Sequence, residues 1–572
     1  MAKSNLLRLR RGLLEFRNGP KASLVRSEEA GGPLIAESRS LLYASNAGVE
    51  FALQAGKVQN LRVAARYLDG RVLRSGELFS FWAHVPRPSL SRGFALGREL
   101  RSGCVIPSVG GGLCQLSNAL FGVALDAGWV IVERHAHTRS VPGSIVERGR
   151  DATLFWNYVD LRFRPKEDCR LSVYLTQSEL RVELRSIEAA RFPIVSLAPA
   201  VALNESGSVA EAESCETCGV SSCFRHPSAS GLVQQGSTAW LVDAWMPEHD
   251  AYMSGDRQAP DVLLTPLDRG RWRVGPYRWT GKGFADVRSA PLFVVWRSLV
   301  SRRLSAQGAS RQRELLRMDA ALAAIYAHRI PATALHVVVS QNLLPHLWRS
   351  GALAGRSFDV LMTRLPLVEL EAQLDRAAGR WPETPTLRDF RVDSELVVAE
   401  TEALAEARHW ITPHTEIAKL GGERSVLLEW QRGPVRVKGA GGRLVFPAST
   451  LSRKGARELR EAVDGLGVEI SLAGAVIEDA EFWRGCEVRR TEGDWLAEAA
   501  IVVLPAWVEH QPRRLLAALS AGVPVICTRS CGLPPQAGLT IVPEGDCVAL
   551  RAAISSFIPD RLSGPFTREI SQ

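Results

Sequence analysis

A glycine run that leads into a cysteine is the part of this sequence most suggestive of chemistry. Gly110, Gly111 and Gly112 precede Cys114, and apolar residues recur at helical spacing over Gln115–Trp129. Glycines allow a sharp turn and leave backbone N–H groups free, so the sequence predicts Cys114 at the positive end of a helix dipole. A thiol in that position ionises more easily, which makes Cys114 a candidate nucleophile.

Histidines and aspartates follow the cysteine where strands are predicted. A short apolar run after the helix predicts a strand, and His135 and His137 come at or beyond its end. Asp151 and Asp160 flank a second strand-like run, 152–156. A thiol, an imidazole and a carboxylate from three successive elements can serve as nucleophile, base and orienting group.

Two other interpretations of the same residues remain open. Free cysteine often packs as a small buried hydrophobe, and a glycine run can serve backbone packing alone. Alternatively, Cys114, His135 and His137 could ligate a metal, because histidines two apart on a strand point to the same face.

The region from about Leu41 to Leu184 resembles the VanW family. The resemblance rests on six ordered motifs: Ser75–Phe81, Arg92–Phe94, Gly110–Ser117, Glu133–Thr138, Gly149–Thr153 and Asp160–Phe163. It implies an envelope or glycopeptide-resistance setting. Gly111, Gly112, Gln115 and Arg134 lie inside these motifs and are expected to support the site. The order of cysteine, histidine and aspartate is also similar to that of transglutaminase and papain-like cores, which implies acyl transfer or amide hydrolysis.

Composition sets the broad class of the protein. The chain has 572 residues, of which 46% are hydrophobic and 23% are charged, so we expect a globular protein of two to four domains. No apolar run reaches the roughly 18 residues that span a bilayer, and no export signal is recognised, so we expect a cytoplasmic protein with reduced thiols. The leading segment, 1–35, contains an arginine-bearing stretch that could rest on an anionic membrane.

The net charge points to small anionic ligands rather than to nucleic acid. A formal charge of +9 is modest for this length and suits ligands such as nucleotides. No DNA- or RNA-binding signature accompanies it, so nucleic acid is not an expected partner.

A cluster of metal-ligand residue types interrupts a polar linker, 196–235. Cys215, Cys218, Cys223 and His226 follow the pattern C-x2-C-x4-C-x2-H. Three thiolates and an imidazole can complete a tetrahedral zinc site, and they also suit an iron–sulfur cluster. The alternative is a linker with incidental thiols.

The C-terminal half alternates strand-like and helix-like stretches, which predicts a doubly wound α/β fold with two Rossmann-like lobes. Strands are expected at 239–242, 262–264, 291–295, 335–339, 425–428, 443–446, 468–472, 500–504 and 524–526, and helices at 454–466 and 511–521. We expect lobes over 236–420 and 421–572, meeting near residues 412–442. An α+β domain over 36–195 precedes them, in which the cysteine helix is followed by strands.

The second lobe carries a further resemblance. Residues 508–526 resemble the donor-site helix of GT-B glycosyltransferases of the glycogen synthase-like clan, and Ser452–Gly455 resembles that clan's Lys-Gly turn. The likeness implies that Arg453 and Lys454 meet the donor diphosphate and that Glu509 holds the donor sugar or ribose. It departs from the clan at Ala517, where a second glutamate is usual.

These inferences combine into a two-module protein. We expect the C-terminal module to move a sugar from a nucleotide donor to an unidentified acceptor. The N-terminal module would act on, or bind, an amide- or peptide-containing molecule through Cys114 and His135 or His137. The alternative is a non-catalytic binding or assembly protein for envelope precursors.

Overall fold

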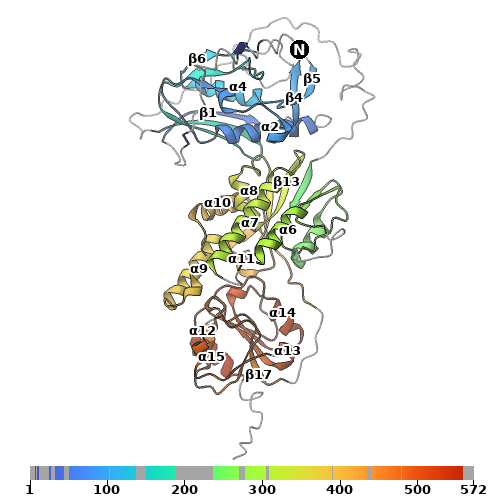
Figure 1. The fold of residues 1–572 in the computed structure, drawn as a ribbon, viewed down its shortest axis with the longest axis vertical. Coiled ribbons are helices and arrows are strands. Elements are labelled where there is room, and N and C mark those ends of the chain that lie inside the picture. The colour runs from blue at the N-terminus through green and yellow to red at the C-terminus, as the bar shows by residue number, and fades with distance from the viewer. Residues whose placement is uncertain are drawn as a thin grey trace, which may run out of the picture. The chain divides into compact units, whose positions relative to one another are not determined.

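The computed structural model describes eleven stretches of the chain and a few isolated residues near its start. They are 32–43, 51–101, 104–136, 150–187, 236–268, 277–304, 308–388, 391–433, 441–477, 480–491 and 493–557, together with Leu7, Arg10, Arg11, Val25 and Arg26. Two compact units result: the first holds residues 1–239 with 328–337 and 350–357, and the second holds the remainder (Figure 1).

The first unit is an α+β fold, as predicted. A four-stranded sheet has the order β1-β9-β8-β2, with bounds Leu34–Leu41, Glu179–Ser186, Cys169–Leu175 and Arg71–Leu73. Its neighbouring strands pair antiparallel. A three-stranded sheet has the order β3 (Phe79–Ser80), β7 (Arg162–Arg164), β6 (Val130–Glu133), and β4 (Leu96–Arg101) pairs with β5 (Cys104–Val109). The helices are α2 (Phe51–Leu68), α3 (Phe81–His84) and α4 (Cys114–Asp126).

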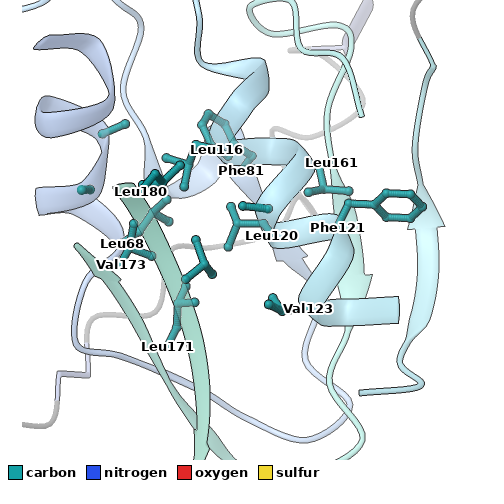
Figure 2. Close-up of a cluster of buried hydrophobic side chains, with 14 of the residues drawn as sticks. Leu68, Phe81, Leu116, Leu120, Phe121, Val123, Leu161, Leu171, Val173 and Leu180 are labelled. Carbon is teal, nitrogen blue, oxygen red and sulfur yellow. The ribbon is translucent and has the colours of Figure 1, made fainter. Parts of the chain in front are cut away.

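Helix α4 forms because its apolar residues recur on one face, and that face is buried. Figure 2 shows Leu116 and Leu120 projecting from α4 into a cluster that includes Leu171 and Leu180 from the four-stranded sheet. All four side chains are fully buried. Because α4 is held by its own core contacts, its first residue, Cys114, has a fixed position.

One expectation in this unit is wrong. Residues 152–156 do not form a strand; they run without regular structure into a turn, and Phe155 makes only an isolated bridge with Val159. The apolar side chains there pack into the core without a ladder, since Ala152 and Leu154 are buried. Burial rather than strand pairing explains the apolar run.

The second unit contains two sheets, and the pairs that can be traced in both are parallel. The first has the order β12-β11-β10-β13-β14-β15-β16, in which β11 pairs with β12, β14 with β15 and β15 with β16 in parallel. Its strands are β10 (Ser237–Leu241), β11 (Val262–Thr265), β12 (Asp286–Ser289), β13 (Ala334–Ser340), β14 (Ser357–Leu361), β15 (Trp410–Thr412) and β16 (Ser425–Leu427). Its helices are α5 (Pro247–Asp256), α6 (Pro291–Ser301), α7 (Ala309–Ala327), α8 (Leu344–Arg349), α9 (Leu367–Arg380), α10 (Ser394–Glu406) and α11 (Thr415–Gly421).

The second sheet has the order β19-β18-β17-β20-β21-β22 and is wholly parallel. Its strands are β17 (Arg443–Phe446), β18 (Ile470–Leu472), β19 (Val488–Arg490), β20 (Ala499–Leu504), β21 (Val525–Thr528) and β22 (Leu539–Val542). Its helices are α12 (Ala456–Val463), α13 (Trp495–Glu498), α14 (Arg513–Ser520) and α15 (Cys547–Ser555). Two parallel sheets with crossover helices confirm the predicted pair of Rossmann-like lobes.

The predicted strand at 291–295 is a helix instead. Pro291 opens α6, where its fixed φ suits the first helical turn. Phe293 is buried while Leu292 and Val295 are 85% and 58% exposed, so the apolar run follows a helical face and not a buried strand. None of the described helices is long and apolar enough to cross a membrane.

Candidate functional site

Cys114 lies at the first residue of α4, as the glycine run predicts. Its Sγ lies 3.8 Å from the Thr153 Oγ1, and the side chain is partly exposed. Thr153 is held in turn by a bond from its backbone N–H to the His135 carbonyl oxygen, 2.7 Å long. The segments that carry the thiol and the histidine are thus joined through Thr153.

The glycines before Cys114 are required by close backbone approach. Gly110 and Gly112 have φ values of +84° and +92°, which L side chains rarely adopt. A Cβ on Gly111 would lie 2.6 Å from the carbonyl carbon and oxygen of Gly97, and one on Gly112 would lie 2.1 Å from the Lys57 Cγ. The turn can therefore hold this shape only with glycine.

Two of the expected supporting side chains, Gln115 and Arg134, form hydrogen bonds that hold the start of α4 and the segment after β6. Gln115 donates from Nε2 to the Ser40 hydroxyl and the Leu41 carbonyl, at 2.9 and 2.8 Å. Arg134 donates from Nε to the Asp151 carbonyl at 2.6 Å. These three bonds tie the start of α4 and the segment after β6 to distant parts of the first unit.

In the described part of the chain, His135 forms no hydrogen bond with Cys114. Its Nε2 lies 3.3 Å from Glu133 Oε1, and half of its side chain is exposed. Among the described residues, Thr153 is the only side chain that forms a hydrogen bond with the thiol. His137 lies outside the described residues. The predicted pairing of a thiol with His135 is therefore not formed here.

A charge cluster, made of Glu133, Arg11, Arg162 and Asp160, lies beside His135. Glu133 accepts two bonds from the Arg11 guanidinium, and Arg162 donates from Nε to Asp160 at 2.8 Å. Burial raises the pKa of Glu133, but the Arg11 and Arg162 cations outweigh it and hold that pKa below its usual range. Burial raises the pKa of Asp160 despite its bonds with Ser80 and Arg162.

The predicted metal ligands in the linker, Cys215, Cys218, Cys223 and His226, lie outside the described residues. Within the stretches that the structure describes, no group of three or more His, Cys, Asp or Glu side chains could hold a metal ion.

The second lobe of the C-terminal unit contains a cavity of about 440 Å³. Two of its walls follow directly after β17 and β18, at Pro447–Ser449 and Ala473–Ala475, and a third is Leu504, the last residue of β20. The fourth is Glu509 with Gln511–Leu515. Strand order reverses between β17 and β20, because β17 pairs with β18 on one side and β20 on the other. The carboxyl edge of a parallel sheet at such a reversal is where doubly wound folds bind ligands.

The N-terminus of α14 lies at this cavity, because its first residues line the wall. Free N–H groups and the helix dipole favour an anion there. Arg514 adds a guanidinium group to the same turn, where it is anchored by a 2.8 Å bond from Nη1 to the Ala473 carbonyl oxygen. The cavity is therefore suited to a phosphate-bearing molecule.

Glu509 lies in the cavity wall, and Lys454 is bonded to it. The Lys454 ammonium donates to Glu509 Oε2 and to the Val508 carbonyl oxygen, both at 2.9 Å. The other carboxylate oxygen of Glu509 accepts from the Gln511 N–H at 2.9 Å. Glu509 is thus fixed at both oxygens and holds a cation beside the anion-binding turn.

The turn that carries Arg453 and Lys454 forms hydrogen bonds with the segment that follows β20. The N–H groups of Trp507 and Val508 donate to the Arg453 carbonyl oxygen at 3.0 and 3.1 Å. Gly455 has a φ of +81°, and a Cβ there would meet the Pro505 carbonyl oxygen at 2.0 Å. Glycine at 455 therefore allows the lysine turn to lie against the segment that carries Glu509.

His414 joins the two lobes, although the sequence gives it no distinguishing feature. It is the N-cap of α11, where its Nδ1 accepts from the Ile417 N–H at 3.4 Å. Its Nε2 donates to the carbonyl oxygens of Glu509 and Ser530, at 3.1 and 3.2 Å. Burial lowers the pKa of this imidazole.

Glu248 is a second joining residue that the sequence does not reveal. It lies in α5 of the first lobe with a side chain that is 0% exposed, and both its oxygens accept from the Arg513 guanidinium, at 2.7 and 2.5 Å. It also accepts from the Gln431 N–H at 2.7 Å. Because Arg513 opens α14, this ion pair fixes the donor-site helix to the first lobe.

Comparison with known protein families fits both sites. Residues 56–185 match the family model described as VanW like protein, and residues 451–560 match the one described as glycosyl transferases group 1. The chain carries a VanW domain and a group 1 glycosyltransferase domain. The glycosyltransferase match covers Lys454, Glu509 and the cavity lining except Pro447–Ser449, and it agrees with the two-lobed GT-B organisation.

Two curated relatives match the VanW domain. The chain is 33% identical over 152 residues to vancomycin B-type resistance protein VanW of Enterococcus faecalis, which is 26% of this chain and 55% of that protein. It is 39% identical over 105 residues to the uncharacterized protein YoaR of Bacillus subtilis, which is 18% of this chain and 34% of that protein. The chain thus spans about half or less of the length of these relatives.

Solved structures similar to the glycosyltransferase half include three glycosyltransferases. Sucrose-phosphate synthase of Thermosynechococcus elongatus is 15% identical with a TM-score of 0.37, covering 57% of this chain and 90% of that one. The lipopolysaccharide glycosyltransferase WaaG is 14% identical with a TM-score of 0.32, covering 56% and 90%. UGT89C1 of Arabidopsis thaliana, complexed with UDP-L-rhamnose, is 12% identical with a TM-score of 0.29, covering 57% and 91%.

Proposed function

We propose that this protein transfers a sugar from a nucleotide-sugar donor, bound in the second-lobe cavity, to an acceptor. The observation that carries the proposal is the position of that cavity. It lies at the carboxyl edge of the second sheet, where strand order reverses. The N-terminus of α14 and Glu509 lie at its wall, and Glu509 is bonded to Lys454.

Each part has a physical role in that reaction. The N-terminus of α14 and the Lys454 ammonium would hold the donor diphosphate, with Arg453 contributing charge from the same turn. Glu509 would accept hydrogen bonds from hydroxyl groups of the donor sugar or ribose. The cavity volume of about 440 Å³ lies within the range typical of small-molecule sites.

The same groups would favour the transfer step. The bond between the anomeric carbon and the diphosphate oxygen breaks, a bond to the acceptor oxygen forms, and the departing diphosphate takes up the proton of the acceptor hydroxyl. Negative charge grows on the departing diphosphate, so a fixed cation and helix N-terminus bind the transition state more strongly than the ground state.

Ala517 bears on how the donor is recognised. It occupies the position where the glycogen synthase-like clan usually has a second glutamate. With Glu509 as the carboxylate in the cavity wall, we infer that fewer donor hydroxyls are recognised there, and that the diphosphate contributes most of the donor affinity.

The VanW domain suggests what the acceptor is. One of its relatives is named for vancomycin B-type resistance, so we propose an envelope precursor as the acceptor. The competing function is that of a binding or assembly protein in which both domains recognise such precursors without turnover.

Donor turnover separates the two functions. The purified full chain should bind and slowly hydrolyse at least one member of a panel of UDP-, ADP- and GDP-sugars. Lys454→Met should weaken binding of that donor, and Glu509→Gln should lower turnover. Lys419→Met, which removes an exposed lysine of α11 outside the cavity wall, should change neither. If wild-type protein neither binds nor hydrolyses any member of the panel, the transferase proposal is refuted.

A further inference from the structure

A second cavity in the same unit, of about 270 Å³, shares no lining residue with the donor cavity. Three arginines line it: Arg457 and Arg460 from α12 and Arg484 from the loop before β19. The residues of α12 that line it are spaced three and four apart, so they occupy one face of the helix, while Leu459 and Ala462 on the opposite face are buried. The cavity is therefore formed by the solvent-facing side of this helix.

Aromatic rings hold two of these arginines in place. The Arg457 guanidinium lies 5.5 Å from the Trp381 ring centre and 5.4 Å from that of Phe482, and Arg460 lies 5.5 Å from Phe482. A guanidinium that stacks on a ring keeps its N–H edge free for a planar or tetrahedral oxyanion. Binding an anion then costs less side-chain entropy, because the rings already restrict these side chains.

Arg457 and Arg460 differ in their carboxylate partners. Arg457 has a carboxylate partner, Glu383, at 2.7 Å, and that glutamate is more than half exposed. Among the residues that the structure describes, no carboxylate forms an ion pair with Arg460. The Arg457 Nε is buried without a hydrogen-bond acceptor.

Two carboxylates complete the lining and indicate what else the ligand carries. Glu461 and Asp464 lie on the same helix face, and Glu461 is 3.3 Å from Arg380. Carboxylates beside an anion site accept hydrogen bonds from hydroxyl groups. The volume lies just below the roughly 300–1,000 Å³ of typical ligand pockets, which favours a compact molecule over a whole nucleotide sugar.

We propose that this cavity binds a phosphorylated sugar, with the phosphate on Arg460, Arg457 and Arg484 and the sugar hydroxyls on Glu461 and Asp464. The site is separate from the donor cavity, so the proposal does not depend on sugar transfer. It would give the protein a second binding site for a sugar derivative.

Calorimetric titration of the full chain tests the proposal, with glucose 1-phosphate, inorganic phosphate and glucose as probes. Wild-type protein should bind glucose 1-phosphate more tightly than inorganic phosphate and should not bind glucose. Arg460→Gln and Arg484→Gln should each weaken glucose 1-phosphate binding about tenfold, the usual effect of one charge-assisted hydrogen bond. Both side chains are exposed, so these variants should fold.

Two variants serve as controls. Arg317→Gln removes an exposed arginine of α7 and should leave the affinity unchanged. Lys454→Met, at the donor cavity, should also leave it unchanged. The proposal is overturned if glucose 1-phosphate does not bind, if inorganic phosphate binds equally well, or if Lys454→Met abolishes binding while Arg460→Gln does not. That last result would place the probe in the donor cavity.

Discussion

The ion pair between Glu248 and Arg513 should respond unequally to loss of its two partners. Glu248 has no exposed side-chain surface, whereas the Arg513 side chain is 33% exposed. Arg513→Met leaves a buried carboxylate with only the Gln431 N–H as donor. Glu248→Gln leaves a guanidinium that water can reach, and the new amide oxygen can still accept from Gln431. Arg513→Met should therefore be the more destabilising change.

The expected loss in free energy of unfolding for each variant follows from how deeply the remaining charge is buried. Removing one partner of a buried pair costs roughly 3–5 kcal/mol when the other charge stays buried, so we expect about 3 kcal/mol for Arg513→Met. For Glu248→Gln we expect about 1.5 kcal/mol, because solvent compensates the exposed part of the guanidinium. The double variant should cost less than the sum of the two, since neither charge is then left alone.

Scanning calorimetry of the full chain measures both effects. At about 2 °C for each kcal/mol in a large domain, the C-terminal transition should fall by about 6 °C for Arg513→Met and about 3 °C for Glu248→Gln. Glu395→Gln breaks an exposed pair with Arg349 and should shift the midpoint by less than about 1 °C. A fall for Glu248→Gln equal to or larger than that for Arg513→Met would refute the reasoning.

Three further predictions concern other parts of the molecule. Burial, with the nearby Asp243 carboxylate, raises the pKa of Asp319 to about 7, so its contribution to stability is complete below about pH 4 and is lost as pH rises through 7. The melting temperature of wild type should fall between pH 4 and 8, and that of Asp319→Asn should not show this fall. If the melting temperatures of both proteins change with pH in parallel, the prediction is wrong. Leu120→Ala empties a fully buried position and should cost about 3 kcal/mol, seen as a lower midpoint of the N-terminal transition alone. Gly111→Ala places a methyl group 2.6 Å from the Gly97 carbonyl, so we expect a loss of about 2 kcal/mol in that same transition, and an unchanged midpoint would mean that the turn can relax.

The parts of the fold that the sequence predicts well are those with strong local signals. Glycines before Cys114 and an apolar period of 3.6 predict α4, which the structure places at Cys114–Asp126. The apolar run at 291–295 carries no such signal, because a short apolar segment fits a buried strand and an exposed helix equally. Leu292 and Val295 are exposed on α6, which only the packing of the whole lobe determines.

The residues that join the lobes could not be predicted, because their partners are distant along the chain. Glu248 meets Arg513 across 265 positions, and His414 meets Glu509 across 95. Each is an ordinary polar residue within its own element. The sequence could predict that Lys454 and Glu509 lie near each other, because a family resemblance placed both residues at one donor site.

The hydrogen bonds of His414 determine how its junction responds to acid. Both ring nitrogens are in use: Nδ1 as acceptor at the start of α11, and Nε2 as donor to two carbonyl oxygens. A second proton on this ring would break the cap of α11, and burial already disfavours the charged form. The imidazole therefore gains its second proton at a more acidic pH than an ordinary histidine does, and the segments carrying Glu509 and Ser530 keep their anchor further into acid.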